Sequence, residues 1–313
     1  MLSIVVRSFG GPEVLEIVER PDPTPGPGQL RVRVVASSVN PIDLSARAGR
    51  LTQAGLMAPS REVGLGWDVA GHVDALGAGV TRFELGQAVI GLRDLLFAPG
   101  AHAEQVVLDA SAVAPAPRSA SLVDAASLPL NALTADRCLE LASVRRGQTV
   151  LVTGAAGGVG GFVLQLAAVH GVATIAVVRR GDEDFVRDLG ATAVVPPDDA
   201  GASLGTAVRA VAPGGVDAVI DAANLGVAAH DALRSGGVFV ALVAPFAPPP
   251  IRATRVVVQE TFADGARLAE LSALVDAGVL TPRVARSFPL TEASAAHELL
   301  EAGGVRGRVL LLP

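Results

Sequence analysis

The alternation of hydrophobic and polar residues divides the chain into two regions of different character. In residues 1–118, short segments alternate with a period of two, as in Leu30–Val35, and glycines and prolines separate them. Further strands are expected over Val69–Leu76, Gln87–Leu92 and Gln105–Leu108. Closely spaced strands with Gly and Pro turns favour a barrel or a sandwich.

The pattern changes near Pro115–Ser119, where helical composition begins. Two helices, separated by Pro129, are expected over residues 121–143. Strands and helices then alternate. The expected strands are Thr149–Thr153, Thr174–Val178, Ala193–Val195, Ala218–Asp221 and Val238–Val243, and the expected helices are Gly158–His170, Asp182–Leu189 and Leu204–Val211. This alternation predicts an α/β fold with a doubly wound parallel sheet.

After a Pro-rich stretch at Pro248–Pro250, a last amphipathic helix is expected over residues 262–277, where Gly278 ends it. A strand over Arg308–Leu312 closes the chain. The sequence contains no internal repeat and no low-complexity tail.

Composition narrows the possible functions. The 313 residues are 50% hydrophobic and carry a net charge of −6, which argues against a nucleic-acid partner. The single cysteine excludes an intrachain disulfide and a zinc site built from several thiolates.

Residues 149–178 contain no charged side chain, and by length they could span a bilayer. They also contain six glycines and divide into strand, turn, helix and strand patterns, so we interpret them as part of a globular domain. The amino-terminal hydrophobic run is too short for a signal sequence. We therefore expect a cytoplasmic protein without a membrane partner.

The most specific chemical signal is a glycine-rich turn between the expected strand Thr149–Thr153 and the following helix. Residues without a Cβ let the backbone turn sharply and approach a pyrophosphate, and the helix directs its positive end at the phosphates. Ala155, Gly157 and Gly160 occupy the three positions of the dinucleotide fingerprint. The alternative is a tight turn with a structural role only. The candidate cofactor-binding residues in the turn are Gly154, Ala156, Gly157, Gly158, Val159 and Gly160.

Two arginines, Arg179 and Arg180, follow the second strand of this unit, where an acidic residue would bind the ribose of NAD. Guanidinium groups suit a 2′-phosphate, so the pair favours NADPH. The alternative is that both are solvated charges that pair with the acidic residues at 182–184. Asn224 and Leu242 are two further candidates for cofactor contact.

Motifs along nearly the whole chain resemble those of one family. They are Phe9–Leu15, Ser38–Asp43, Gly66–Gly71, Gly77–Phe83, Ala125–Leu130, Leu133–Ala135 and Gly303–Val309, together with the glycine-rich turn. On these residues the chain resembles the zinc-independent quinone oxidoreductases, which are the zeta-crystallin-like branch of the medium-chain dehydrogenase/reductase superfamily. The resemblance implies a GroES-like barrel in residues 1–118 and a Rossmann domain in residues 119–250. Residues 251–313 would return to the first domain, and the active site would lie in the cleft between the two.

The metal-binding motifs of zinc-dependent members are altered in this chain. Those members carry Cys-x-x-Asp and Gly-His-Glu segments, and the corresponding stretches here run from Asn40 to Asp43 and from Gly66 to Asp68. Asn40 stands at the thiolate position and Trp67 at the imidazole position. We therefore expect no metal, and catalysis would depend on positioning a hydride donor against an electrophilic carbon.

The resemblance also implies catalytic candidates. Asn40 is a candidate hydrogen-bond donor to the substrate oxygen, with loop capping as the alternative, and Asp43 is expected to order the same loop. Thr134 would place a hydroxyl near the nicotinamide, with a helix-start role as the alternative. Trp67 would form a cleft wall, unless it serves packing alone. Tyrosines that relatives carry after the Asn-Pro-x-Asp segment are replaced here, with Ser45 and Leu51 near those places.

These features favour an NADPH-dependent reductase whose partner is a small electrophile, with a quinone as the first choice of substrate. An enone or enoyl reductase acting on an α,β-unsaturated carbonyl is the first alternative, and a non-catalytic NADPH-binding redox sensor is the second. By analogy with the family we expect a homodimer, in which Val238–Val243 pairs across a two-fold axis as a sheet edge.

Overall fold

The computed structural model describes residues 1–93, 100–196 and 203–313, and these form two compact units. Unit 1 comprises Met1–Leu130 and Phe262–Pro313, and unit 2 comprises Asn131–Thr261. The boundaries follow residues 130 and 261, whereas the sequence analysis placed them after residues 118 and 250. The shift has a physical cause at each place: residues 119–130 bond to unit 1 through Ser38 Oγ and Ala126 O at 2.7 Å, and residues 255–258 add a strand to unit 2.

Unit 1 is built mainly of antiparallel strands. A sheet of order β15-β16-β3-β5-β6-β8, with β7 also paired to β3, lies beside a smaller sheet of order β2-β1-β4. The strands are β1 (Leu2–Val6), β2 (Leu15–Glu19), β3 (Gln29–Val39), β4 (Val63–Gly64), β5 (Asp68–Leu76), β6 (Ala88–Leu92), β7 (Gln105–Asp109), β8 (Val113–Pro115), β15 (Val284–Pro289) and β16 (Arg308–Leu312). The helices are α1 (Pro41–Arg47), α2 (Arg50–Gln53), α3 (Leu122–Ala125), α9 (Gly265–Asp276) and α10 (Ala293–Ala302).

The alternation that predicted the first strands is the one that fills the core. Leu30, Val32 and Val34 on β3 are buried against Val69 and Val73 of β5, while the intervening residues of β3 face outward. The C-terminal strand β16 pairs with β3, and Val309 and Leu311 are fully buried.

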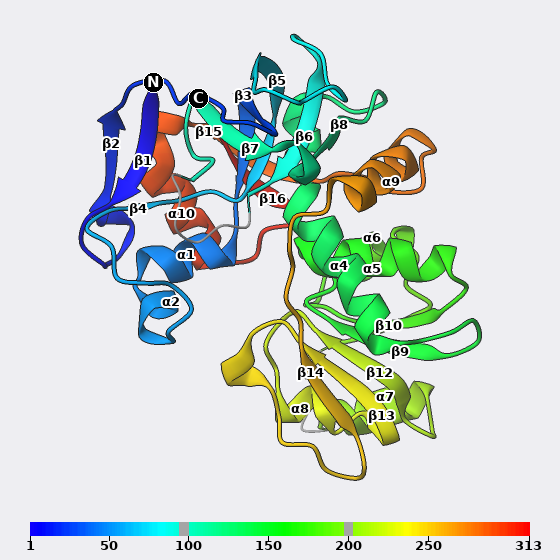
Figure 1. Cartoon of the computed structure of the whole chain (residues 1–313). Helices are drawn as coiled ribbons and strands as arrows, with labels where there is room; N and C mark the ends of the chain where they lie inside the picture. The colour runs from blue at the N-terminus through cyan, green and yellow to red at the C-terminus, as the bar shows by residue number, and fades with distance from the viewer. Residues whose placement is uncertain (94–99, 197–202) are drawn as a thin grey trace. The chain divides into compact units, whose positions relative to one another are not determined.

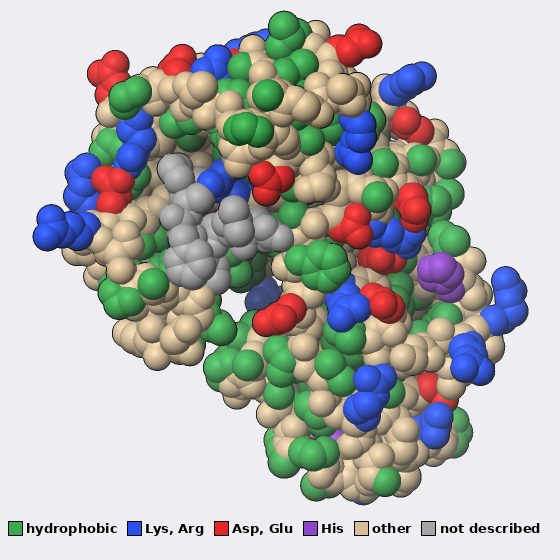
Figure 2. Space-filling model, viewed as in Figure 1, with side chains coloured by type: hydrophobic (Ala, Val, Ile, Leu, Met, Phe, Trp, Pro, Cys, Tyr) green, Lys and Arg blue, Asp and Glu red, His purple; other side chains and the backbone are tan. Residues whose placement is uncertain are grey.

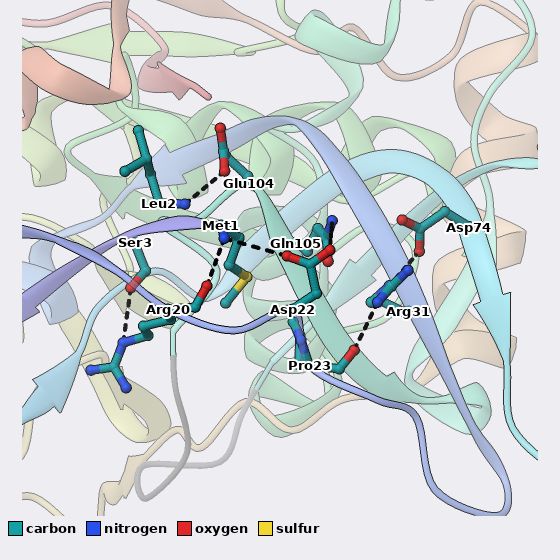
Figure 3. Close-up of polar contacts among 10 residues, drawn as sticks. All are labelled: Met1, Leu2, Ser3, Arg20, Asp22, Pro23, Arg31, Asp74, Glu104 and Gln105. Carbon is teal, nitrogen blue, oxygen red and sulfur yellow. Dashed lines mark hydrogen bonds and ion pairs between the residues drawn. The ribbon is translucent and has the colours of Figure 1, made fainter.

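Polar contacts secure the first strand of unit 1 (Figure 3). Leu2 N donates to the Glu104 carboxylate at 2.6 Å, and the Met1 amino group donates to Arg20 O at 2.6 Å. The Arg20 guanidinium in turn donates to Ser3 Oγ at 3.1 Å. These contacts fix strand geometry and contribute no residue to the candidate site.

Unit 2 contains a six-stranded parallel sheet of order β11-β10-β9-β12-β13-β14 (Figure 1). The strands are β9 (Thr149–Thr153), β10 (Ala173–Val177), β11 (Ala193–Val195), β12 (Val216–Asp221), β13 (Leu233–Ala241) and β14 (Arg255–Val258). The helices are α4 (Pro129–Ala142), α5 (Gly158–Val169), α6 (Glu183–Asp188), α7 (Leu204–Val211) and α8 (Val227–His230). The predicted α/β class with a doubly wound parallel sheet is confirmed.

The direction of winding reverses between β9 and β12. The chain moves outward from β9 to β11, then returns to β12 and continues to β14. Because crossovers between parallel strands are right-handed, α5 and α6 cover one face of the sheet, and α7 and α8 cover the other. Leu151, Val219 and Phe239 are fully buried at its centre, as expected for strands covered on both faces.

Two expectations about this region have different outcomes. The uncharged segment 149–178 forms β9, α5 and β10, and within the described part of the chain no helix is long and apolar enough to cross a membrane. The expectation that Val238–Val243 forms a sheet edge is wrong, because β13 is paired on both sides and β14 occupies the edge. The Pro-rich stretch before β14 concealed this strand from the sequence analysis.

Candidate functional site

The glycine-rich turn lies where the sheet of unit 2 reverses direction. It follows β9, and the segment 222–226 follows the neighbouring strand β12. Both segments are therefore at the carboxyl ends of parallel strands, on either side of the switch point. In doubly wound sheets this is where dinucleotides bind.

The backbone of the turn needs glycine at two places. Gly154 has a φ of +59°, a conformation that side chains with a Cβ rarely adopt. A Cβ on Gly160 would overlap Gly154 O and lie 2.7 Å from Ala155 Cα, so α5 can pack this closely only without one. Gly157 has an ordinary φ of −75°, and a Cβ there would meet only Gly154 O, at 3.1 Å. The residues of the turn thus fit a dinucleotide pyrophosphate, with Gly157 at the beginning of α5 and no side chain to block approach.

A buried carboxylate organises the other side of the switch point. Asp221, at the end of β12, accepts hydrogen bonds from Thr153 Oγ1 at 2.6 Å, Leu225 N at 3.0 Å and Gly226 N at 2.8 Å. Ala223 N donates to Thr153 Oγ1 at 2.9 Å, so the ends of β9 and β12 are joined. This role of Asp221 was not predicted from the sequence, although Thr153 and Asp221 are polar residues at the ends of two hydrophobic strands.

The expected cofactor contacts after β12 and β13 lie at the same edge of the sheet. Asn224 has a φ of +57°, and its Oδ1 atom is buried without a partner among the described residues. Such an oxygen can accept a hydrogen bond from a ligand. Leu242 directly follows β13 and is half-buried.

Arg179 and Arg180 follow β10, one strand from the glycine-rich turn, and both are exposed. Two of the three acidic residues expected as alternative partners make other contacts: Glu183 accepts from Gly181 N at 2.6 Å, and Asp184 pairs with Arg187 at 2.7 Å. Within the described residues no ion pair holds the Arg179 side chain. Its guanidinium remains available to an anion at the carboxyl end of the sheet.

In unit 1, two buried carboxylates surround Asn40, which begins α1. Asp43 accepts from Asn40 N at 2.8 Å and from Gly66 N at 2.7 Å, so it ties the start of α1 to the segment before β5. Asp68 accepts from Asn40 Nδ2 at 2.6 Å and from Leu130 N at 2.6 Å. The Asn40 amide also donates to a backbone carbonyl, that of residue 38, at 3.4 Å. Its amide hydrogens are thus directed at acceptors within unit 1.

Burial dominates the electrostatics of this cluster. Desolvation raises the pKa of Asp68 to about 7 and also raises the pKa of Asp43. Arg308 on β16 is close enough to favour the charged form of both carboxylates, and its own burial lowers its pKa to about 10. The presence of Arg308 in this cluster was not predicted, because β16 lies far from α1 in the sequence.

The pKa of Asp68 makes stability depend on pH with a definite sign. A pKa raised from 3.8 to about 7 means that the folded chain binds this proton more tightly than the unfolded chain. The resulting stabilisation is complete below the unfolded pKa and is lost as pH rises through about 7. We expect the unfolding free energy of the wild type minus that of Asp68→Asn to fall by up to about 1.4 kcal/mol per pH unit between pH 4 and 7. Urea denaturation of both proteins at each pH measures this difference, and a difference independent of pH would contradict the assignment.

A second buried network lies behind α1. Arg47 donates to His297 Nδ1 at 3.1 Å and pairs with Glu301, and both Arg47 and His297 are almost completely buried. Burial lowers the pKa of His297 to about 3, so this imidazole is neutral. His102 Nε2 lies 3.0 Å from the carbonyl oxygen of Ser38, which fixes its tautomer with the proton on Nε2. The network anchors α10 to α1.

The two remaining candidates lie on different elements. Thr134 is on α4 in unit 2, where its hydroxyl lies 2.8 Å from Thr261 Oγ1. Trp67 precedes β5 in unit 1 and is half-buried, and its carbonyl accepts from Arg93 N at 2.7 Å. The structure thus groups Asn40 with Asp43 in unit 1, and the glycine-rich turn with Asn224 in unit 2.

The donor atoms near Asn40 and Trp67 do not suit zinc. An amide and an indole stand at the places where zinc-dependent relatives carry a thiolate and an imidazole, and neither is a zinc ligand. Among the described residues there is no group of three or more His, Cys, Asp or Glu side chains that could hold a metal ion.

Two family models match the chain, each over a different segment. Residues 26–118 match the alcohol dehydrogenase GroES-like domain, and residues 189–311 match the zinc-binding dehydrogenase family. The first match covers much of the antiparallel unit 1. The second begins within the parallel sheet and continues into the returning C-terminal segment.

Individual relatives match over nearly the whole chain. A quinone oxidoreductase of Pseudomonas aeruginosa is 30% identical over 99% of this chain and 99% of its own length. The chloroplastic NADPH-dependent alkenal/one oxidoreductase of Arabidopsis thaliana is 28% identical over 100% of this chain and 80% of its own. A mycobacterial protein solved in complex with NADPH is 33% identical, with a TM-score of 0.86 and full coverage of both chains. The GroES-like unit, the Rossmann-like sheet and the turn that fits a dinucleotide agree with these matches. The chain is an oxidoreductase that binds a nicotinamide cofactor, and it belongs to the quinone oxidoreductase branch of the medium-chain dehydrogenase/reductase superfamily.

Proposed function

We propose that this protein is an NADPH-dependent reductase that transfers hydride to a quinone without a metal. The observation that carries the choice of NADPH is the exposed pair Arg179–Arg180 at the carboxyl end of β10, next to the glycine-rich turn. Two guanidinium groups at this place suit a ribose 2′-phosphate. The mycobacterial structure in complex with NADPH supports the same choice.

Bound NADPH would supply the hydride, and the chain would supply binding, orientation and electrostatics. Gly154, Gly157 and Gly160 would let the backbone approach the pyrophosphate, and α5 would direct its positive end toward it. Asn224 Oδ1 would accept a hydrogen bond from the cofactor.

Asn40 and Asp43 would act on the substrate side. Because the Asn40 amide donates to Asp68 at 2.6 Å and to Ser38 O at 3.4 Å, it can serve a substrate oxygen only if it shares or exchanges one of these bonds. Asp43 would hold the Asn40 loop in place through its bonds to Asn40 N and Gly66 N. Trp67 would offer a flat apolar surface to a planar substrate.

The choice between substrates rests on relatives of both kinds. The Pseudomonas aeruginosa relative is named a quinone oxidoreductase, and the Arabidopsis thaliana relative acts on alkenals and alkenones by its name. In both reactions hydride adds to an electrophilic carbon, and the negative charge that it brings is delocalised onto a carbonyl oxygen, which a proton then neutralises. Reduction of an α,β-unsaturated carbonyl is therefore the second candidate function.

The test compares electrophiles at saturating NADPH. We expect kcat/KM to be higher for 1,4-benzoquinone than for a simple alkenal, as measured by loss of NADPH absorbance. A higher kcat/KM for the alkenal would establish the second candidate instead. Binding of NADPH without turnover on either compound would favour a non-catalytic sensor and contradict both reductase functions.

We also propose that the protein forms a homodimer through β14. This strand is the edge of the parallel sheet, and hydrophobic side chains are exposed on the surface near it, at Val243, Phe246, Ile251 and Val258. Figure 2 shows hydrophobic side chains over the region that Figure 1 colours yellow. Open edges of this kind pair readily with a second strand.

Light scattering tests the dimer directly. We expect the wild type to have twice the mass of one chain and Val258→Lys, a charge on the exposed edge, to be monomeric. Leu85→Lys provides a control at an exposed hydrophobic residue of unit 1, and it is expected to remain dimeric. A monomeric wild type would contradict the proposal.

A further inference from the structure

The two halves of the parallel sheet serve different ends of a dinucleotide. In doubly wound sheets each half binds one mononucleotide, and the pyrophosphate lies at the switch point. Arg179 and Arg180 follow β10, so the half formed by β9, β10 and β11 takes the 2′-phosphate end. The half formed by β12, β13 and β14 is left for the nicotinamide end. This step rests on the proposed use of NADPH.

Three polar side chains, joined in series by hydrogen bonds, lie at the carboxyl edge of that second half. Gln259 and Thr261 follow β14, and Gln259 N donates to Ala241 O at 3.0 Å, which fixes the segment beside the end of β13. Thr261 Oγ1 donates to Gln259 Oε1 at 2.8 Å. Thr134 Oγ1 on α4 lies 2.8 Å from Thr261 Oγ1.

The donor and the acceptor in each bond of this series follow from the number of hydroxyl hydrogens. A hydroxyl has one hydrogen to donate and two lone pairs that accept. Thr261 uses its hydrogen on Gln259, so Thr134 must be the donor in the Thr134–Thr261 bond. Within the described residues Thr134 Oγ1 has no third partner, and its residue is 4% exposed. Its remaining lone pairs are shielded from bulk water and can only accept.

We propose that Gln259 and Thr261 orient the Thr134 hydroxyl so that it accepts a hydrogen bond from the carboxamide NH2 of the nicotinamide. Thr134 is then a cofactor-binding residue, and Gln259 and Thr261 are positioning residues that act through it. The arrangement selects a carboxamide over a group that has no N–H. It also assigns Thr134 a role other than proton donor to the substrate, because its hydrogen is already used.

The test compares NADPH with its reduced 3-acetylpyridine analogue, in which a methyl group replaces the NH2. Dissociation constants are measured by cofactor fluorescence, without substrate. We expect the wild type to bind NADPH about five- to tenfold more tightly than the analogue, which is within the range of one neutral hydrogen bond. Thr134→Val should abolish this preference, and Thr134→Ser should restore it.

Two further variants separate orientation from simple packing. Thr261→Val leaves the Thr134 hydrogen free to donate to the acetyl oxygen, so the preference for NADPH should fall although Thr134 is intact. Thr149→Val, at the opposite edge of the sheet where β9 begins, is the matched control and should keep the wild-type preference. Melting temperatures establish that all variants are folded.

The outcomes distinguish this inference from the proposed function. A full preference for NADPH in Thr134→Val would overturn the role of Thr134 while leaving the reductase function standing. An unchanged preference in Thr261→Val would overturn the orienting role of Gln259 and Thr261. A wild type that binds neither NADPH nor the analogue would overturn the proposed function and this inference with it.

Discussion

Replacing Arg179 and Arg180 together by alanine is expected to weaken NADPH binding roughly 100-fold and to leave NADH binding nearly unchanged. Each guanidinium can form charge-assisted hydrogen bonds with the 2′-phosphate, and hydrogen bonds to charged groups contribute about 1.5–3 kcal/mol each. Both arginines are exposed, so solvent and salt screen part of this contribution. NADH has a hydroxyl group in place of the phosphate, so its affinity should decrease little.

The matched control is the double variant Arg145→Ala with Arg146→Ala. It removes the same charge from unit 2, but these arginines precede β9 and therefore lie at the amino edge of the sheet. Isothermal titration with both cofactors should show wild-type affinities for this control. Equal losses for NADPH and NADH in the Arg179 and Arg180 variant would contradict the 2′-phosphate assignment.

Gly160→Ala is expected to lower the free energy of unfolding by about 3 kcal/mol and NADPH affinity by more than about tenfold. The new Cβ would overlap Gly154 O and press on Ala155 Cα at 2.7 Å, and neither backbone atom can move without displacing α5 from the turn. Urea denaturation measures the first effect, and cofactor fluorescence measures the second.

Two other glycines make this prediction specific. The Cβ added by Gly157→Ala would meet only Gly154 O, at 3.1 Å, so this variant should keep most of the wild-type stability. It should nevertheless bind NADPH more weakly, because the Cβ occupies the approach to the pyrophosphate. Gly214→Ala, in the loop before β12, has nothing within 4 Å and should change neither quantity. Wild-type affinity in Gly160→Ala and Gly157→Ala alike would show that the turn does not bind the cofactor.

The parallel sheet could be predicted because its signals are local. The predicted strands Thr149–Thr153 and Ala193–Val195 have the observed bounds, since each is a short hydrophobic run, the first ended by glycine and the second by proline. Strand β14 was not predicted, because it follows a proline run and two residues, Arg252 and Ala253, with positive φ angles. No sequence pattern predicts that conformation at these residues. The error about the sheet edge followed from that omission.

The site was predictable only where one segment carries the chemistry. The glycine-rich turn and the two arginines are contiguous motifs, whereas Asp68 reaches Leu130 across 62 positions, and Thr134 reaches Thr261 across 127. Asp221 likewise depends on the pairing of β12 with β9, which the order of strands along the chain does not reveal. Such contacts depend on how the strands and helices pack, and one sequence does not contain that information in local form.

We propose that this chain transfers hydride from NADPH to a quinone without a metal. The most direct measurement is steady-state oxidation of NADPH by 1,4-benzoquinone, using protein treated with a chelator, with NADH measured in parallel. We predict undiminished turnover with NADPH after chelation and a kcat/KM for NADH roughly 100-fold lower. Turnover that disappears on chelation and returns with zinc would contradict the metal-free reaction, and equal kcat/KM values for the two cofactors would contradict the preference for NADPH.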